Sequence, residues 1–224
     1  IQLENLEKIE NLYYLKSTKQ PYTGEIIGLH SGKFYNGYKE GFFFTFYKNG
    51  KILSIKNYKE GKLNGYSLEF YLSGRLLKKN KYKEGILNGE YLNFYNVGQL
   101  MSKKNYINGK LHGQYLDYYK NGQLMSKKNY NYGELEGEFL VYHEYEFNEV
   151  VQIKVKKYYK NTKLNGDFLL YNENGYMIDK GFYKDGKLEG YYYKYNNKGK
   201  LIQKRIYKDG NLKNDLTENF NLSN

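Results

Sequence analysis

The chain has 224 residues, including 30 Tyr, 12 Phe and 24 Gly but only one Pro and no Trp, a composition that favours strands and turns over helices. It has no cysteine, which excludes disulfides and thiolate metal sites, and no apolar run approaches the roughly 20 residues of a membrane helix. A formal net charge of +12 suggests attraction to acidic proteins, anionic lipids or nucleic acids, although lysine-rich surfaces also serve solubility alone.

Residues 1–33 differ from the rest of the chain and are predicted to form an N-terminal capping segment. Leu3, Leu6, Ile9 and Leu12 have a spacing that a short helix could use. The pattern then predicts a strand up to Leu15, a polar turn over residues 17–21 and a second strand over residues 23–29. These two strands are expected to form a capping hairpin, because the end of a repeat array needs a cover for its core.

A repeat of 24 residues occupies residues 34–212. The unit YKEGKLNGYSLEFYLSGRLLKKNK starts at Tyr58, and similar units start at Tyr82 and Tyr106. The first unit, from Phe34, is in frame but has Lys39 in the position that later holds Leu63. Self-similarity at a fixed period of this length indicates a repeat architecture. The glycine that closes each G-x-L-x-G motif recurs at Gly65, Gly89, Gly113 and Gly137, then at Gly166 and Gly190.

Each repeat is expected to be a two-stranded antiparallel hairpin. Pairs such as Glu60-Gly61, Asn108-Gly109 and Asp185-Gly186 join successive repeats, and Asn-Gly and Asp-Gly are strong hairpin signals because glycine supplies positive φ. The predicted fold is therefore all-β, an elongated single-layer antiparallel meander of stacked hairpins. The recurring tyrosines are predicted to pack over the recurring glycines, so that a valine at Gly89, Gly113 or Gly137 would collide with an aromatic ring.

An insertion near residues 143–150 interrupts the repeat spacing. Insertions in repeat proteins map to loops that are often on the binding face, although lengthening a surface loop also costs little free energy. Tyr145 and Phe147 are the candidate binding residues of this loop. Residues 213–224 lose the pattern and are predicted to form a polar C-terminal cap or tail.

The pattern Y-x-x-G-x-L-x-G-x-x-x-x-F/Y-x-x-x-G-x-L resembles the bacterial, antitoxin-like variant of the MORN repeat over roughly residues 34–212. The segment Pro21-Tyr22-Thr23-Gly24 also resembles the turn that commonly precedes such arrays. The chain departs from the pattern at Lys39, at Thr162 in place of a turn glycine, and at the insertion. The resemblance implies an elongated antiparallel sheet that is used for protein association or attachment near a membrane, and some bacterial members are named antitoxin-like or immunity-like.

Motifs of catalysis are absent from the sequence, which predicts a protein that is not an enzyme. His30, His112 and His143 lack the spacing of metal ligands, and no G-x-S-x-G, H-E-x-x-H, Walker or G-x-G-x-x-G motif occurs. Repeat-equivalent carboxylates such as Glu69 and Asp117 are expected on a solvated ladder. We therefore expect no metal, no cofactor and no small-molecule substrate.

A lysine ladder is the one pattern with functional character, and two roles for it remain open. It repeats with the array and is flanked by further basic residues, so a stripe beside aromatics could bind phosphates and bases, or simply keep an exposed sheet soluble. The first hypothesis is a scaffold for an unidentified protein partner, and the second is binding of anionic lipid or nucleic acid. The candidate binding residues are Lys79, Lys103, Lys127, Lys156, Lys180 and Lys204, with Tyr71, Tyr95, Tyr119, Tyr145 and Phe147; the flanking residues are Lys78, Lys104, Lys128, Lys157 and Arg205.

The sequence leaves the cellular location open. The chain begins with Ile1 rather than Met, so the periplasm or cell surface is favoured if a leader has been removed, and the cytoplasm otherwise.

Overall fold

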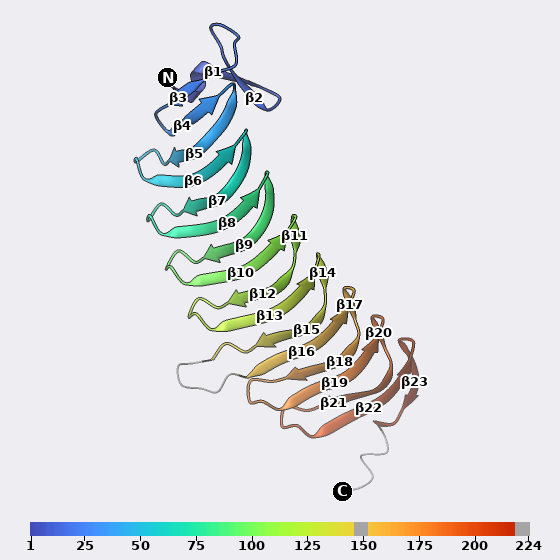
Figure 1. Ribbon diagram of the computed structural model, residues 1–224. Coiled ribbons are helices and arrows are strands. Elements are labelled where there is room, and N and C mark those ends of the chain that lie inside the picture. The colour runs from blue at the N-terminus through green and yellow to red at the C-terminus, as the bar shows by residue number, and fades with distance from the viewer. Residues whose placement is uncertain (146–151, 218–224) are drawn as a thin grey trace. The chain divides into compact units, whose positions relative to one another are not determined.

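A computed structural model describes residues 1–145 and 152–217, and it confirms the all-β antiparallel meander of stacked hairpins (Figure 1). The chain divides into two compact units, residues 1–110 and 111–224. In the first unit strand β3 pairs with β4, and in the second β23 pairs with β22.

The first unit contains one short 3-10 turn and a series of strands that pair with their neighbours in sequence. Its elements are η1 (Leu3–Asn5), β1 (Leu6–Ile9), β2 (Leu12–Leu15), β3 (Gly24–Ile26), β4 (His30–Tyr35), β5 (Tyr38–Phe46), β6 (Ile52–Lys59), β7 (Lys62–Phe70), β8 (Leu76–Lys83), β9 (Ile86–Phe94) and β10 (Leu100–Ile107).

In the second unit the first strand of each hairpin is split in two, with a two-residue piece before the main strand. Its elements are β11 (Lys110–Leu111), which begins at the last residue of the first unit, β12 (Gly113–Tyr118), β13 (Leu124–Asn131), β14 (Glu134–Leu135), β15 (Gly137–Tyr142), β16 (Ile153–Lys160), β17 (Lys163–Leu164), β18 (Gly166–Tyr171), β19 (Met177–Lys184), β20 (Lys187–Leu188), β21 (Gly190–Tyr195), β22 (Leu201–Lys208) and β23 (Asn211–Asp215).

The turns between repeats have the predicted conformation. Glu60 and Gly61 have φ of +50° and +76°, as a two-residue hairpin turn with two left-handed residues requires. The Gly61 N–H donates to the Lys39 carbonyl at 3.0 Å, and the equivalent bond recurs in later repeats. Thr162, where a glycine was expected, still adopts φ of +65°; its N–H donates to the Leu135 carbonyl at 2.9 Å and its Oγ1 accepts from the Leu135 N–H at 3.2 Å. These two bonds hold Thr162 in a conformation that a β-branched residue rarely adopts.

The predicted packing of tyrosines over the recurring glycines is wrong at Gly89, Gly113 and Gly137, although Tyr158 does approach Gly166. Tyr130 does lie opposite Gly113 in the register, but no atom lies within 4 Å of the place where a Gly113 side chain would begin. Gly137 has the same empty surroundings, and Gly89 is approached by the Lys81 side chain rather than by a ring. These glycines are needed for their backbone conformation, because Gly113 has φ of +79° and Gly137 has +75°.

The N-terminal segment folds differently from the prediction. No helix spans residues 1–16; β1 and β2 form a hairpin in which Leu6 pairs with Leu15, while β3 pairs with β4 instead of β2. A helix this short is marginal by itself, whereas the hairpin places Leu6 in a buried cluster with Ile26, Phe34 and Phe43. This cluster is the hydrophobic core of the first unit, and Phe34 is fully buried in it.

Alternation of side chains along the strands divides the sheet of each unit into two faces. We call one the leucine–lysine face, with the registered rows Leu68, Lys79, Leu92 and Lys103 in the first unit and Leu116, Lys127, Leu140, Lys156, Leu169, Lys180, Tyr193 and Lys204 in the second. We call the other the aromatic–cation face, with Phe43, Lys56, Ser67, Asn80, Tyr91 and Lys104 in the first unit and Tyr115, Lys128, Phe139, Lys157, Phe168, Gly181, Tyr192 and Arg205 in the second.

Candidate functional site

The predicted lysine ladder lies on the leucine–lysine face of both units. Lys79 pairs with Leu68 on one side and Leu92 on the other, and in the second unit Lys156 lies between Leu140 and Leu169 in the same way. Successive lysines of a unit are two strands apart, a separation of about 10 Å. Their aliphatic stems run beside the leucines, and Leu140 is only 8% exposed although it lies on this face.

Carboxylates on the same face neutralise part of this charge. Glu90 lies between two ladder lysines, with its oxygens 3.6 Å from Lys79 Nζ and 3.5 Å from Lys103 Nζ. Glu138 lies 2.7 Å from Lys156 Nζ, and a hydrogen bond from this ammonium holds the pKa of Glu138 below its usual value. The ladder is therefore a mixed surface of leucine, lysine and glutamate rather than a continuous cationic stripe.

Lys127 and Lys180 make no ion pair with a carboxylate in residues 1–145 and 152–217, although the charge of Lys127 contributes to the lowered pKa of Glu138. Lys180 is exposed and Lys127 is half-buried. Lys204 instead lies over two rings, with Nζ 4.8 Å from the Tyr191 centroid and 5.9 Å from that of Tyr193. Cations are thus available to a partner mainly in the second unit.

The basic residues that flank the ladder lie on the opposite face, because neighbouring residues of a strand point in opposite directions. Lys128 lies between two rings, 4.5 Å from the Tyr115 centroid and 5.6 Å from that of Phe139, and 3.1 Å from Asp117. Lys157 lies over Phe168 at 5.5 Å. These cations are bound into the packing of the aromatic–cation face and do not add to the lysine ladder.

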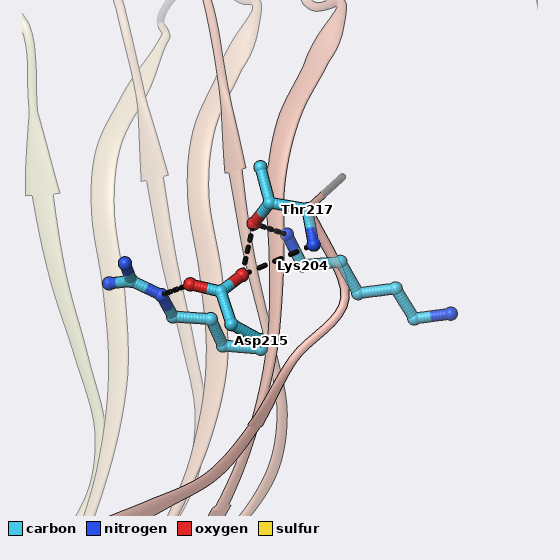
Figure 2. Close-up of polar contacts among 4 residues, drawn as sticks. Lys204, Asp215 and Thr217 are labelled. Atoms are coloured by element: carbon cyan, nitrogen blue, oxygen red, sulfur yellow. Dashed lines mark hydrogen bonds and ion pairs between the residues drawn. The ribbon is translucent and has the colours of Figure 1, made fainter. Parts of the chain in front are cut away.

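At the end of the second unit, the neighbouring residues Lys204 and Arg205 show this difference between the two faces. Arg205 Nε donates to an Asp215 carboxylate oxygen at 2.8 Å, and Asp215 also accepts from the Thr217 hydroxyl and, at 3.1 Å, from the Thr217 N–H. Figure 2 shows the Lys204 side chain running away from Asp215, although the Lys204 N–H donates to Thr217 Oγ1 at 3.4 Å. The hydrogen bonds that Asp215 accepts from Thr217 and Arg205 lower its pKa.

The predicted tyrosines of the turns connect one hairpin to the next. The Tyr71 hydroxyl donates to the Phe94 carbonyl at 2.7 Å, and the Tyr119 hydroxyl donates to the Tyr142 carbonyl at 2.9 Å. Tyr95 occupies the equivalent turn, where its N–H donates to the Gln99 carbonyl at 2.8 Å. The hydroxyls of Tyr71 and Tyr119 therefore have a structural partner, and their rings are half-buried.

The insertion is described only at its two ends. The His143 ring is buried, and its Nε2 lies 3.0 Å from the Tyr171 carbonyl, in the position where the preceding turns have a tyrosine hydroxyl. The side-chain amide of Gln123 donates from Nε2 to the Tyr145 carbonyl at 2.8 Å, and its Oε1 accepts from the Tyr145 N–H at 3.2 Å. Phe147 lies outside the described residues.

The histidines are not brought together. His30 Nδ1 lies 3.3 Å from Thr45 Oγ1, and the His112 ring lies beside that of Tyr132. Across residues 1–145 and 152–217, no group of three or more His, Asp or Glu side chains is placed to hold a metal ion. Within the same residues, no helical segment has the length and apolar character needed to cross a membrane.

One feature of the structure had no counterpart among the predicted site residues. Lys39, which the sequence shows only as a departure from the leucine repeat, inserts its ammonium among the rings of Tyr13, Phe43 and Tyr58. The sequence feature that could have indicated this contact is a lysine at a repeat position that is otherwise leucine.

Compared with models of known protein families and with curated proteins, the chain matches none.

Proposed function

We propose that this protein is a non-enzymatic β-repeat scaffold of the MORN type that binds a protein partner on the leucine–lysine face of its second unit. The supporting observation is the row in which leucines alternate with lysines, including the unpaired Lys127 and Lys180. All described strands of this unit belong to one sheet, so the unit provides no second layer to cover the row. The apolar side chains of the row are half-buried, apart from the buried Leu140, and a partly exposed apolar surface can serve as an association site.

The chemistry of the face defines the partner that would fit. Leucine and tyrosine side chains match an apolar segment, and the lysines match acidic side chains at intervals of about 10 Å. A partner segment with alternating apolar and acidic residues would satisfy both. Because some bacterial MORN-like proteins are named antitoxin-like or immunity-like, the proposal includes such a role for this protein. A toxin-like gene beside the gene of this protein would support it.

The second candidate function is binding of anionic lipid or nucleic acid by the same lysines. The unpaired ammonium groups of Lys127 and Lys180 favour it, whereas the carboxylates of Glu90 and Glu138 would repel phosphates along the row. The mixed composition of the face therefore supports a protein partner better.

The test is co-purification with quantitative mass spectrometry from the source cells. The wild type is compared with a Lys127→Glu, Lys180→Glu variant and with a matched control, Lys160→Glu, Lys187→Glu, which changes exposed lysines at the hairpin ends. We expect a stoichiometric protein partner that the control retains and the face variant loses. A partner held equally by both variants, or no stoichiometric partner, would contradict the proposal.

A second measurement separates the two candidate functions. Purified protein is titrated with phosphatidylglycerol vesicles and with a single-stranded oligonucleotide at increasing salt. Binding that falls steeply with salt and is lost in the Lys127→Glu, Lys180→Glu variant would favour the polyanion, because counterion release dominates such contacts.

A further inference from the structure

A small polar pocket in the first unit is lined in part by the N-terminal hairpin. It has a volume of about 160 Å³ and is lined by Lys8, Asn11, Tyr13, Lys39, Tyr58 and Gly61. Lys8 and Tyr13 come from the β1–β2 hairpin, whereas Lys39 and Tyr58 come from β5 and β6. The pocket therefore exists only because the hairpin is folded against the first strands of the array.

The Lys39 ammonium is held at this pocket by three aromatic rings. Its Nζ lies 4.9 Å from the Phe43 ring centroid, 5.0 Å from that of Tyr58 and 5.5 Å from that of Tyr13. Rings attract a cation through their faces, but they do not neutralise its charge. Lys39 has no ion pair with any described carboxylate, although it is half-buried.

The repeat shows that this cation is not needed for the hairpin. The positions equivalent to Lys39 are Leu63 and Leu87, and in all three repeats the backbone carbonyl accepts the same bond from a turn glycine. A leucine would fit the fold and avoid the cost of burying a charge. Lys39 replaces leucine in the one repeat in which this position lines the pocket.

The other polar groups of the pocket are also able to donate. They are the Lys8 ammonium, the Asn11 amide and the hydroxyls of Tyr13 and Tyr58, and no Asp or Glu is among the residues that line it. Burial raises the pKa of both tyrosines, so their hydroxyls remain protonated donors at neutral pH. Burial lowers the pKa of Lys39, and the charges of Lys8 and Lys56 lower it further. An anion in this pocket would stabilise the charged form of Lys39.

We propose that this pocket binds a small tetrahedral oxyanion, either free phosphate or the terminal phosphoryl group of a small ester, with Lys39 and Lys8 as the charged donors. The volume is several times the ~30 Å³ of one water molecule, which leaves room for such a group. Lysine is a common phosphate ligand because its ammonium acts as a compact charge. The tyrosine hydroxyls and the Asn11 amide would supply neutral hydrogen bonds to the remaining oxygens.

The experiment is isothermal titration of the full chain with inorganic phosphate, in chloride buffer of matched ionic strength. We expect saturable binding with one site per chain. Lys39→Leu, which installs the residue of the later repeats, should keep its melting temperature in the absence of phosphate and bind phosphate at least about tenfold more weakly, as loss of a charged hydrogen bond predicts. Lys8→Gln should weaken binding less, and Lys160→Leu, which changes an exposed lysine at a hairpin end of the second unit, should leave it unchanged.

The two sources of the oxyanion are separated by a parallel titration with glycerol 3-phosphate. Tighter binding of the ester identifies a terminal phosphoryl group as the ligand, and tighter binding of the free ion identifies phosphate. Absence of saturable binding to either, or equal affinities for wild type and Lys39→Leu, would overturn the proposal. None of these outcomes bears on the leucine–lysine face.

Discussion

At the residue scale, Gly113 is required by its backbone conformation rather than by crowding. Gly113 has φ of +79° and empty space where a side chain would begin. A residue with a Cβ in left-handed backbone meets its own carbonyl, at a cost of about 1–2 kcal/mol. Gly181 is the opposite case, because a Cβ there would lie 3.1 Å from Tyr192 and 3.2 Å from Leu188, and its φ is not left-handed.

Substitutions at Gly113 separate the two causes. We expect Gly113→Ala to lower the free energy of unfolding by about 1–2 kcal/mol, and Gly113→Asn to cost less because asparagine tolerates this conformation. Gly113→Val should cost the most, because its branched side chain is least compatible with positive φ. Urea denaturation of the three variants measures the order. If alanine were the best tolerated and cost increased only with side-chain volume, crowding would be the cause after all.

The ion pair of Glu138 and Lys156 should make a small, pH-dependent contribution to stability. The pKa of Glu138 is lower in the folded protein than its usual value of 4.5, chiefly because of the hydrogen bond from Lys156. The stabilisation is therefore present above pH 4.5 and is lost as the pH falls through the lowered value. Because both side chains are partly exposed, we expect Glu138→Gln to cost only about 0.2–1 kcal/mol at neutral pH.

Urea denaturation of wild type and Glu138→Gln at neutral and at acidic pH tests this dependence. The difference between the two proteins should shrink once the glutamate is protonated. A difference that is the same at both pH values would mean that shape, rather than charge, stabilises this contact.

At the scale of the element, hydroxyls of the turn tyrosines form hydrogen bonds between one hairpin and the next. The Tyr47 and Tyr71 hydroxyls donate to the Phe70 and Phe94 carbonyls, both at 2.7 Å. Because the acceptor belongs to the following repeat, the bond stabilises the stacking of hairpins rather than one hairpin by itself. At the opposite end of the hairpins, the turn glycines donate to carbonyls of the preceding repeat.

Removing one of these hydroxyls should weaken the stacking measurably. We expect Tyr71→Phe to lower the free energy of unfolding by about 0.5–1.5 kcal/mol, the usual net value of a hydrogen bond. Tyr35→Phe is the control, since Tyr35 is 61% exposed. Thermal or urea unfolding measures both, and equal effects of the two substitutions would show that the Tyr71 hydroxyl bond contributes nothing.

The repeated hairpins could be predicted from the sequence because each is specified locally, by a glycine turn and two short alternating segments. The N-terminal segment could not, because Leu6 and Phe34 meet only through side-chain packing of the β1–β2 hairpin against the first strands of the array. The spacing of Leu3, Leu6 and Ile9 is compatible with a helix. These residues instead precede or form the β1–β2 hairpin, because tertiary packing stabilises the hairpin more than a helix this short.

The sequence predicted which lysines of the candidate site form one row, but not which side chains surround them. The period identified Lys127 and Lys156 as one row, yet only the register shows leucines between them. Lys128 was grouped with the row, whereas side-chain alternation places it on the other face against Asp117. The cage around Lys39 joins residues from the cap and from the array, and no repeat pattern connects those two segments.

At the scale of the whole molecule, strands pair with strands that lie close to them in the sequence. A destabilising substitution is therefore expected to act locally rather than on the whole chain. In each unit the stabilising contacts recur between adjacent hairpins, so the stability of the array approximates a sum of neighbouring interfaces. Tyr159 belongs to one such interface: it lies opposite Gly137, and its ring is 6.1 Å from that of Phe139. Truncating it should remove about 1–3 kcal/mol from that interface.

Hydrogen exchange of Tyr159→Ala measures how far this damage spreads. We expect amides of β15, β16 and β18 to exchange faster than in the wild type, because opening these hairpins becomes easier. The amides of Phe34 and Phe43, in the buried cluster of the first unit, should keep their protection because no contact of that cluster involves Tyr159. Equal loss of protection in both units would mean that the chain unfolds as one cooperative body, and the nearest-neighbour description would then be wrong.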